Sequence, residues 1–169
     1  MKKLVIIICL LLLFTSCTQP SKENYQDFLS TLKTSQTNLY YSLKDIDKNG
    51  IDELLILQNT TLCVYTFENG VRLVGEHDFV TATCRFFYSD NKNFPGVFYF
   101  TVGGGANHYG YMTIKDNTLV LEALWQENYA TETDKGIQQL CSDKDLISES
   151  KSLYENNRDI KFKKIKKYA

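Results

Sequence analysis

Apolar and polar residues alternate with a period of two from Asn38 to about Leu124, and this pattern constrains the fold more than any other feature of the chain. Successive side chains of a strand point to opposite faces of a sheet, so the alternation predicts strands with at least one buried face. Aromatic and β-branched residues, which favour strands, are frequent in the same region. The expected strands are Leu39–Leu43, Glu53–Gln58, Thr61–Phe67, Val71–Glu76, Ala82–Tyr88, Gly96–Val102, Tyr109–Lys115 and Thr118–Leu124.

Short turns separate several of these expected strands. Asn69-Gly70 is the strongest hairpin signal in the chain, and Asp116-Asn117 is a second one, because these residue types tolerate a positive φ. Consecutive strands joined by short turns pair with each other in most sheets. We therefore expect an antiparallel β-meander sheet, built from hairpins like those of a propeller blade.

A helix is expected before the first strand. Within Ser21–Lys33, apolar residues recur at spacings of three and four, which places them on one stripe of a helix. Ser21 is suited to cap the N-terminus of this helix. The stripe, which we expect to pack against the sheet, consists of Tyr25, Phe28, Leu29 and Leu32.

The alternation stops after Trp125, and helical periodicity replaces it. We expect one helix over Asp134–Cys141 and another over Asp143–Asn156, with Ser142 as the N-cap of the second. The last segment, Asp159–Tyr168, is predicted to be a short strand whose lysines are typical of a sheet edge. The fold class expected from these elements is α+β, with an N-terminal helix and C-terminal helices.

The first seventeen residues predict export followed by lipid attachment. Lys2 and Lys3 precede an apolar run, Leu4 to Phe14, that is too short to span a bilayer, and two small residues then lead to Cys17. This arrangement resembles the lipobox of bacterial lipoproteins, although Phe14 stands where that family usually has Leu. The resemblance implies a signal peptide and lipobox in residues 1–17, a lipid such as palmitate on Cys17, and a membrane-anchored, extracytoplasmic protein. An ordinary secretory signal or an uncleaved anchor is the alternative.

The rest of the chain is long enough for one domain. Residues 18–22 are expected to form a polar tether, and residues 23–169 a single α+β domain with its own core. The formal net charge of −1 becomes −3 when Lys2 and Lys3 leave with the signal peptide, since no acidic residue lies among residues 1–17. A mildly acidic domain argues against nucleic acid as the partner.

Three of the five cysteines belong to this domain, because Cys9 lies in the signal peptide and Cys17 is the lipidation site. An odd set can form at most one internal disulfide. Cys63, Cys84 and Cys141 all lie in apolar contexts, so free buried thiols are the expected state and a single disulfide is the alternative.

The segment Asp45–Glu53 predicts a cation site. Oxygen-bearing side chains recur at alternate positions before Gly50, which permits a sharp turn, and an acid follows just ahead of a strand. Ca²⁺ binds about six to eight oxygens, and a tight loop can supply them from alternate residues. The expected ligands are Asp45, Asp47, Asn49, the backbone carbonyl of Ile51, and Glu53. An Asx-turn loop that holds no ion is the alternative.

The spacing of this segment resembles the calcium loops of FG-GAP or integrin-propeller-type repeats, D-x-D-x-[DN]-G-x-x-[DE]-L, with Glu53 at the ninth position and Leu54 at the tenth. An EF-hand would need its bidentate acid at the twelfth position, which is Ile56 here. The layout of Tyr40–Leu57 and the following hairpin is also similar to uncharacterised surface lipoproteins of Gram-positive gut bacteria. These resemblances imply a structural Ca²⁺ ion and bring no known activity.

A second candidate site is the glycine-rich segment Gly103–Gly110. Three consecutive glycines allow close approach to the backbone, and a ligand-binding pocket could be lined there by Asn107, His108, Tyr109 and Tyr111. A glycine bulge that lets a twisted sheet turn is the alternative.

No nucleophile elbow, metalloprotease helix or paired-carboxylate signature is present in the sequence, so we expect no enzymatic activity. The predicted function is that of a calcium-stabilised binding or interaction module with a protein or glycan partner. Two alternatives remain open: a lipid-anchored inhibitor or immunity protein acting against a toxin or hydrolase, and a hydrolase that uses His108.

Overall fold

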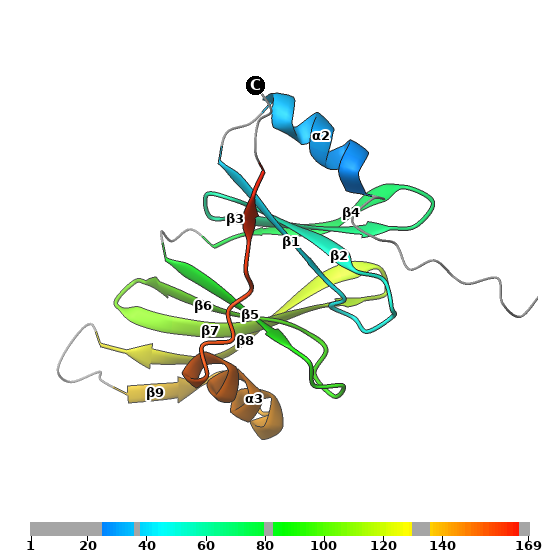
Figure 1. Cartoon of the computed structure of the whole chain (residues 1–169). Coiled ribbons are helices and arrows are strands. Elements are labelled where there is room, and N and C mark those ends of the chain that lie inside the picture. Colours follow the sequence, from blue (N-terminus) through cyan, green and yellow to red (C-terminus); the bar gives the residue numbers. More distant parts are fainter. Residues whose placement is uncertain (1–24, 36–37, 80–82, 130–135, 166–169) are drawn as a thin grey trace, which may run out of the picture.

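The computed structural model describes residues 25–35, 38–79, 83–129 and 136–165 (Figure 1). Cys17, the signal peptide and the tether therefore lie outside the described residues. The eight strands expected between residues 39 and 124 are all present, two with the expected bounds and the others extended or displaced by a few residues. In chain order the elements are α2 (Gln26–Ser35), β1 (Leu39–Lys44), β2 (Glu53–Gln58), β3 (Thr61–Phe67), β4 (Val71–Asp78), β5 (Cys84–Ser89), β6 (Gly96–Gly103), β7 (Ala106–Lys115), β8 (Thr118–Asn128), β9 (Gly136–Gln139), α3 (Lys144–Glu155) and β10 (Lys163–Lys164).

The strands form two antiparallel sheets. The first sheet has the order β10-β1-β2-β3-β4, and the second sheet has the order β5-β6-β7-β8-β9. The α+β class and the antiparallel meander connectivity are confirmed, because consecutive strands are neighbours within each sheet. The single sheet that we expected is instead divided after β4. Two stacked sheets can bury their inner faces against each other, which one continuous, strongly twisted sheet of this many strands does less well.

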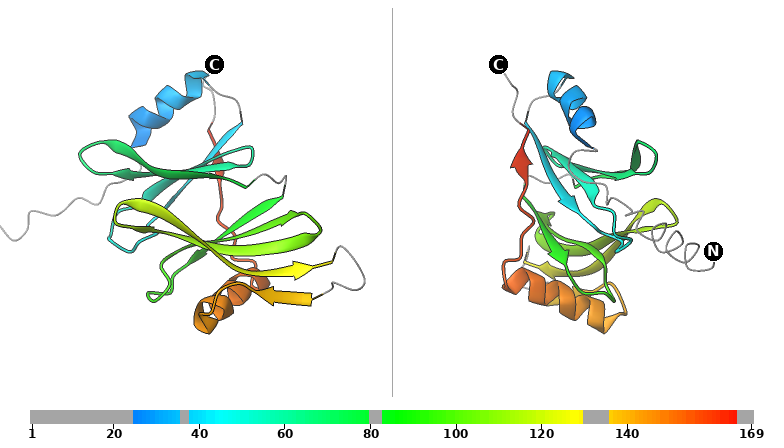
Figure 2. Two further views of the ribbon diagram at one scale, coloured as in Figure 1. Left: turned by 180° about the vertical axis from the view of Figure 1, so that it is seen from behind. Right: turned by 45° about the vertical axis from the view of Figure 1, so that its right-hand side comes forward.

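The two sheets stack face to face, and one helix covers each outer face (Figures 1 and 2). Helix α2 packs on the outer face of the first sheet, as predicted: its Leu29 and the preceding residue Tyr25 belong to one buried cluster with Leu54 and Ile56. Helix α3 packs on the outer face of the second sheet through Leu146, Ile147 and Leu153. The core between the sheets contains Ile46, Leu55, Leu62, Val64, Val74, Phe79, Phe86, Val97, Met112 and Ile160.

Both predicted hairpin signals lie in tight turns. Asn69 has a φ of 56° between β3 and β4, and Asp116 and Asn117 have φ values of 49° and 60° between β7 and β8. These left-handed conformations are the reason for the residue types at those positions.

The helix expected over Asp134–Cys141 is wrong for the part that the structure describes. Gly136–Gln139 is strand β9, which pairs antiparallel with the end of β8. Ile137, Leu140 and Cys141 have a spacing that suits a helix, but β8 continues to Asn128 and offers an unpaired edge. Backbone hydrogen bonding to that edge overrides the local periodicity.

The single C-terminal helix of the described chain begins one residue later than expected. Asp143, and not Ser142, is its N-cap: the Asp143 carboxylate accepts hydrogen bonds of 3.0 Å from the backbone N–H groups of Asp145 and Leu146. A carboxylate satisfies these free N–H groups and also interacts favourably with the positive end of the helix dipole.

The C-terminal segment ties the two sheets together, and we call residues 159–165 the strap. The backbone N–H of Ile160 donates a hydrogen bond of 2.7 Å to the carbonyl of Phe86 in the second sheet. Further along the strap, β10 pairs with β1, so that it forms the lysine-bearing edge of the first sheet that we predicted. Figure 1 shows the strap running from α3 up to the first sheet.

Two further expectations concern the thiols and the membrane. Cys63 and Cys84 are half-buried and Cys141 is buried, and none of these three cysteines forms a disulfide. Among the described residues, no helix is both long enough and apolar enough to cross a bilayer.

Candidate functional site

The loop between β1 and β2 is attached to the second sheet. Ile46 inserts a fully buried side chain into the core between the sheets, and its carbonyl accepts a hydrogen bond of 3.3 Å from the hydroxyl of Thr113 in β7. The hydroxyl of Tyr88 in β5 donates a hydrogen bond of 2.9 Å to the carbonyl of Asp45. The loop therefore bridges the two sheets at the point where its acids lie.

Three carboxylates converge in this loop, and we call them the three-acid cluster. Asp45, Asp47 and Glu53 each have an oxygen within 4.8 Å of an oxygen of the other two. Glu53 has no exposed surface, whereas the two aspartates are half-buried. The structure thus brings together three of the five predicted cation ligands.

The backbone of the loop turns tightly around the three-acid cluster. Gly50 has a φ of 90°, a conformation that glycine adopts without strain, and its N–H donates a hydrogen bond of 3.1 Å to Asp45 Oδ2. Asp47 Oδ1 accepts one of 3.2 Å from the N–H of Asn49. These Asx-type contacts hold the aspartates in position.

The two other predicted ligands lie beside the cluster. The Asn49 carboxamide donates a hydrogen bond of 3.0 Å from Nδ2 to Asp47 Oδ2, and its Oδ1 accepts one of 2.7 Å from the N–H of Ile51. Asp47, Asn49 and Ile51 all border a small cavity of about 180 Å³ next to the loop. Asn49 and Ile51 therefore line an opening beside the three acids.

Within the described residues, no cation forms an ion pair with the three-acid cluster, and Lys48 interacts with Asp45 only at longer range. Lys48 directs its ammonium to the hydroxyl of Tyr88 at 2.5 Å and to Asp90 at 3.9 Å, and no ion pair within the described part of the chain joins it to the three acids. In addition, Asp45 Oδ1 is buried and has no hydrogen-bond partner among the described residues. A buried, unpaired carboxylate oxygen is costly unless a cation or a donor approaches it.

The protein environment opposes ionisation of Glu53 and Asp47. Burial, together with the charges of Asp47 and Asp45, raises the pKa of Glu53 to about 8, although hydrogen bonds from Ile46 and Thr66 act in the opposite direction. Burial likewise raises the pKa of Asp47, and the charge of Asp45 adds to this effect. A divalent cation at the cluster would favour the ionised forms instead.

The glycine-rich segment is the turn between β6 and β7, with positive φ values at Gly104 and Gly105. Tyr109 lines a pocket of about 260 Å³ at the outer face of the second sheet, which we call the ligand pocket. The Asn107 carboxamide and the Tyr109 hydroxyl donate hydrogen bonds of 3.1 and 3.3 Å to Oε2 of Glu127, which also lines this pocket.

Of the four predicted pocket residues only Tyr109 lines the ligand pocket: Asn107 contacts its Glu127, and His108 and Tyr111 lie elsewhere. A ring nitrogen of His108 lies 3.1 Å from the carbonyl oxygen of Gly103, within the β6–β7 hairpin. The Tyr111 hydroxyl donates a hydrogen bond to the carbonyl of Pro95. Because side chains alternate along a strand, His108 points to the opposite face of the second sheet from Tyr109.

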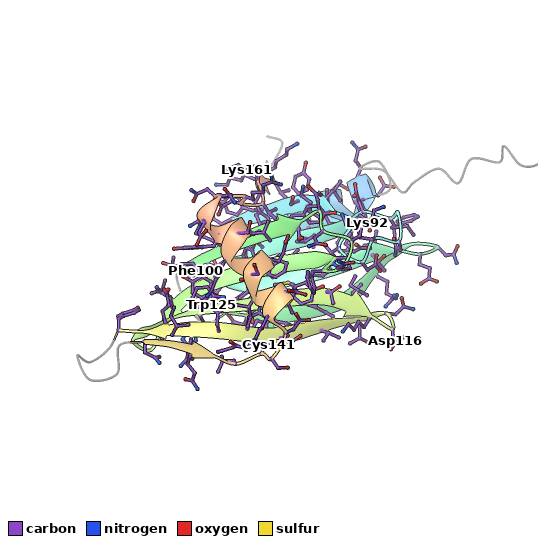
Figure 3. The ribbon with its side chains drawn as sticks, turned by 90° about the horizontal axis from the view of Figure 1, so that it is seen from below. Lys92, Phe100, Asp116, Trp125, Cys141 and Lys161 are labelled. Atoms are coloured by element: carbon purple, nitrogen blue, oxygen red, sulfur yellow. The ribbon has the colours of Figure 1, made fainter. Side chains whose placement is uncertain are left out.

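Most of the ligand pocket was not identified from the sequence. Trp125 stacks on Tyr109 with ring centroids 3.5 Å apart and an interplanar angle of 6°. Lys151 Nζ lies 5.1 Å from the centre of the Trp125 ring. Helix α3 supplies Lys151 and crosses the outer face of the second sheet, where Phe100 and Trp125 lie beside it (Figure 3). The complete lining is Tyr109, Trp125, Glu127, Ile137, Lys151, Tyr154 and Glu155.

Comparison with protein-family models finds no match to this chain, and comparison with curated proteins finds no related sequence. The three-acid cluster and the ligand pocket are therefore interpreted from their own geometry.

Proposed function

We propose that this chain is a lipid-anchored, extracytoplasmic binding module whose two sheets are stabilised by one Ca²⁺ ion at the three-acid cluster. The observation that carries the proposal is the convergence of Asp45, Asp47 and Glu53 within 4.8 Å, with Glu53 completely buried. Three acids gathered in this way repel one another unless a cation intervenes. The loop would then serve a structural purpose and take no part in chemistry.

The donor set fits a hard cation. The three acids and the neighbouring Asn49 offer oxygen ligands, and the described part of the chain places no histidine or cysteine in the cluster. Oxygen-only ligands suit Ca²⁺ or Mg²⁺. Ca²⁺ tolerates the irregular geometry of a flexible loop, whereas Mg²⁺ demands a near-octahedral arrangement. This difference favours Ca²⁺.

The ion would stabilise the contact between the two sheets. The backbone of the loop that contains Asp45 accepts hydrogen bonds from Tyr88 and Thr113 of the second sheet. An ion that fixes the loop would fix these contacts and thereby raise the free energy of unfolding by an amount that increases with ion concentration. Few protein ligands imply a modest affinity, which suits the calcium concentrations found outside cells.

Calorimetry on residues 22–169 tests the calcium proposal. Titration with CaCl₂ is expected to release or absorb heat with saturation, and the melting temperature is expected to fall when EDTA replaces calcium. Mg²⁺ at the same concentration should produce a smaller shift. An absence of binding heat, together with identical melting temperatures in EDTA and in calcium, would exclude a structural Ca²⁺ ion.

The anchor is tested separately. Replacement of Cys17 by Ser removes the thiol that would receive the lipid, and the protein is expected to move from the membrane fraction to the medium or the soluble extracytoplasmic fraction. Labelling of the unmodified chain with radioactive palmitate should fail in the Cys17→Ser variant. Retention of that variant in the membrane with an uncleaved N-terminus would support an uncleaved anchor instead.

The ligand pocket is the binding site that we propose for the partner. It combines aromatic walls, the carboxylate of Glu127 as a hydrogen-bond acceptor and the ammonium of Lys151. Such a combination suits a hydroxyl-rich molecule with an apolar face, such as a glycan, or a polar side chain of a protein.

The chain contains one tryptophan, and this residue lines the ligand pocket. Its fluorescence therefore reports occupancy of the pocket without a label. Titration with soluble glycans is expected to change the Trp125 emission with saturation in the unmodified domain and not in the Glu127→Ala variant. Recovery of a single stoichiometric protein from the native envelope, without any glycan response, would favour an inhibitor or immunity function.

A further inference from the structure

A further concave surface lies along the strap, apart from the residues that line the ligand pocket. It is an open groove of about 460 Å³ between the edge strand region of β1, the end of β5 and the strap. We call it the basic groove. Its lining includes the cationic residues Lys44, Arg158, Lys161 and Lys163.

The cations of the basic groove exceed its acids. Asp90 and Asp159 are the acidic residues in the lining. Asp159 is already paired with Arg85, whose Nε and Nη2 donate hydrogen bonds of 2.8 and 2.7 Å to the two carboxylate oxygens. Asp90 lies 3.9 Å from the ammonium of Lys48, a residue that does not belong to the groove lining.

Within the described residues, the four cations of the lining form no ion pair. The groove therefore has an excess of positive charge, although the whole chain has a formal net charge of −1.

Two ammonium groups approach the ring of Tyr88 at one end of the basic groove. The Nζ atoms of Lys44 and Lys48 each lie 4.6 Å from the centre of the Tyr88 ring. The Tyr88 hydroxyl is fixed, since it donates to the carbonyl of Asp45 and accepts from Lys48. Both ammonium groups add positive charge at this end of the groove, which favours the approach of an anion.

Protection of a sheet edge does not account for this arrangement. Edge protection explains exposed lysines on β10, which is an edge strand. Lys44 belongs to β1, however, and Arg158 lies before the strap. Neither residue is on the strand that needs protection, yet both line the same concave surface.

We propose that the basic groove binds a phosphate ester, with the phosphate held by Lys44, Arg158, Lys161 and Lys163. The guanidinium of Arg158 can bind two phosphate oxygens at once, and the lysines act as mobile point charges. The apolar atoms of Tyr41, Leu43 and Ile160 in the same lining would contact the organic part of the ester. The ester can be a soluble organic phosphate or a phospholipid headgroup, and the experiment below distinguishes the two.

The test uses the full chain in micelles of a neutral detergent and follows backbone amide chemical shifts by NMR. In one arm, glycerol phosphate and, separately, inorganic phosphate are titrated. In the other arm, phosphatidylglycerol is added to the micelles, with phosphatidylcholine as the control because its choline neutralises the phosphate. Saturable shifts at Tyr88 and Lys161 are expected in at least one arm. Shifts with glycerol phosphate identify a soluble ester, and shifts with phosphatidylglycerol alone identify a headgroup.

Charge variants show whether the groove itself is responsible. Lys161 and Lys163 are exposed, so Lys161→Gln and Lys163→Gln are expected to fold, and each should weaken binding about tenfold through loss of a charge-assisted contact. Lys115→Gln on the β7–β8 hairpin removes the same charge from another exposed site and should leave the affinity unchanged. Equal weakening by Lys115→Gln, or no shifts at Tyr88 and Lys161 in either arm, overturns the proposal.

Discussion

The buried carboxylate of Glu53 accepts a hydrogen bond of 2.9 Å from the backbone N–H of Ile46, seven residues earlier in the chain. This bond closes the loop upon the three-acid cluster, while Thr66 donates a bond of 3.3 Å to the other carboxylate oxygen. Glu53 is therefore held in place by the fold itself. The same position is unfavourable for its charge, because burial and the two aspartates raise its pKa to about 8.

Replacement of Glu53 by Gln should distinguish two effects of this acid: the destabilisation caused by its buried position and its proposed role as a calcium ligand. The Gln carboxamide can accept from the Ile46 N–H and donate to Thr66, and it carries no charge. In EDTA at pH 7, we expect the free energy of unfolding to rise by on the order of 2–3 kcal/mol. The reason is that Glu53 must bind a proton when the chain folds at this pH, whereas Gln is neutral in both the folded and the unfolded state. In CaCl₂, the stabilisation by calcium should be lost. Urea unfolding followed by circular dichroism measures both quantities.

The matched control for Glu53→Gln is Glu155→Gln, which removes a carboxylate from an exposed position at the end of α3. Its unfolding free energy and its calcium response should both stay close to those of the unmodified domain. If Glu53→Gln kept the full calcium response, Glu53 would not be a ligand.

Without calcium, the protein should become less stable as pH rises. An acid in an ion pair has the opposite effect, because its pKa is lowered by folding. Between the ordinary pKa of 4.5 and about 8, the folded protein retains a proton on Glu53 that the unfolded chain has released. The free energy of unfolding should therefore fall by a few kcal/mol as pH rises through this window. Excess calcium favours the ionised acid and should flatten this decline, since binding releases the proton. Urea unfolding from about pH 5 to about pH 8, with EDTA or with CaCl₂, should give diverging curves, and parallel curves would contradict the model.

The strand positions could be predicted from the sequence because each strand carries its own periodic signal. Leu54, Leu55 and Ile56 are all buried, since both faces of β2 are covered, yet the bounds of the strand were correct. The division into two sheets has no comparable local signal. It depends on which residues meet across space, such as Val64 and Met112 in the core between the sheets.

The two candidate sites differ in the same way. The acids of the three-acid cluster lie within nine residues, so that their spacing alone predicts that they converge. The ligand pocket takes Tyr109 from β7 and Lys151 from α3, and no short-range pattern links these residues. The β9 strand was missed for a different reason: the edge of β8 that it covers is close in the sequence, but the spacing of Ile137, Leu140 and Cys141 indicates a helix.

The ion pair between Arg85 and Asp159 attaches the strap to the second sheet and should contribute measurably to the free energy of unfolding. Asp159→Asn removes the charge and is expected to lower the free energy of unfolding by about 1 kcal/mol, a small value because both side chains are partly exposed to solvent. The hydrogen bond from Arg85 lowers the pKa of Asp159, so this contribution is present above pH 3.8 and is lost as pH falls through the lowered pKa. Asp90→Asn, at a mostly exposed acid 3.9 Å from Lys48, is the control and should change the stability by less.

Gly110 is required because the ring of Tyr99 occupies the space of its missing side chain. A Cβ atom at residue 110 would lie 2.0 Å from Cζ and 2.1 Å from the hydroxyl of Tyr99, which pairs with it across β6 and β7. Gly110→Ala should therefore lower the free energy of unfolding by about 1–3 kcal/mol, measured by urea unfolding. Adding Tyr99→Leu to Gly110→Ala should recover part of this loss, because the shorter side chain makes room for the methyl group. Gly136→Ala is the control, because a Cβ there would meet nothing within 4 Å, and its free energy of unfolding should stay close to that of the unmodified chain. If Gly136→Ala were as destabilising as Gly110→Ala, the effect would come from the backbone freedom of glycine and not from the contact with Tyr99.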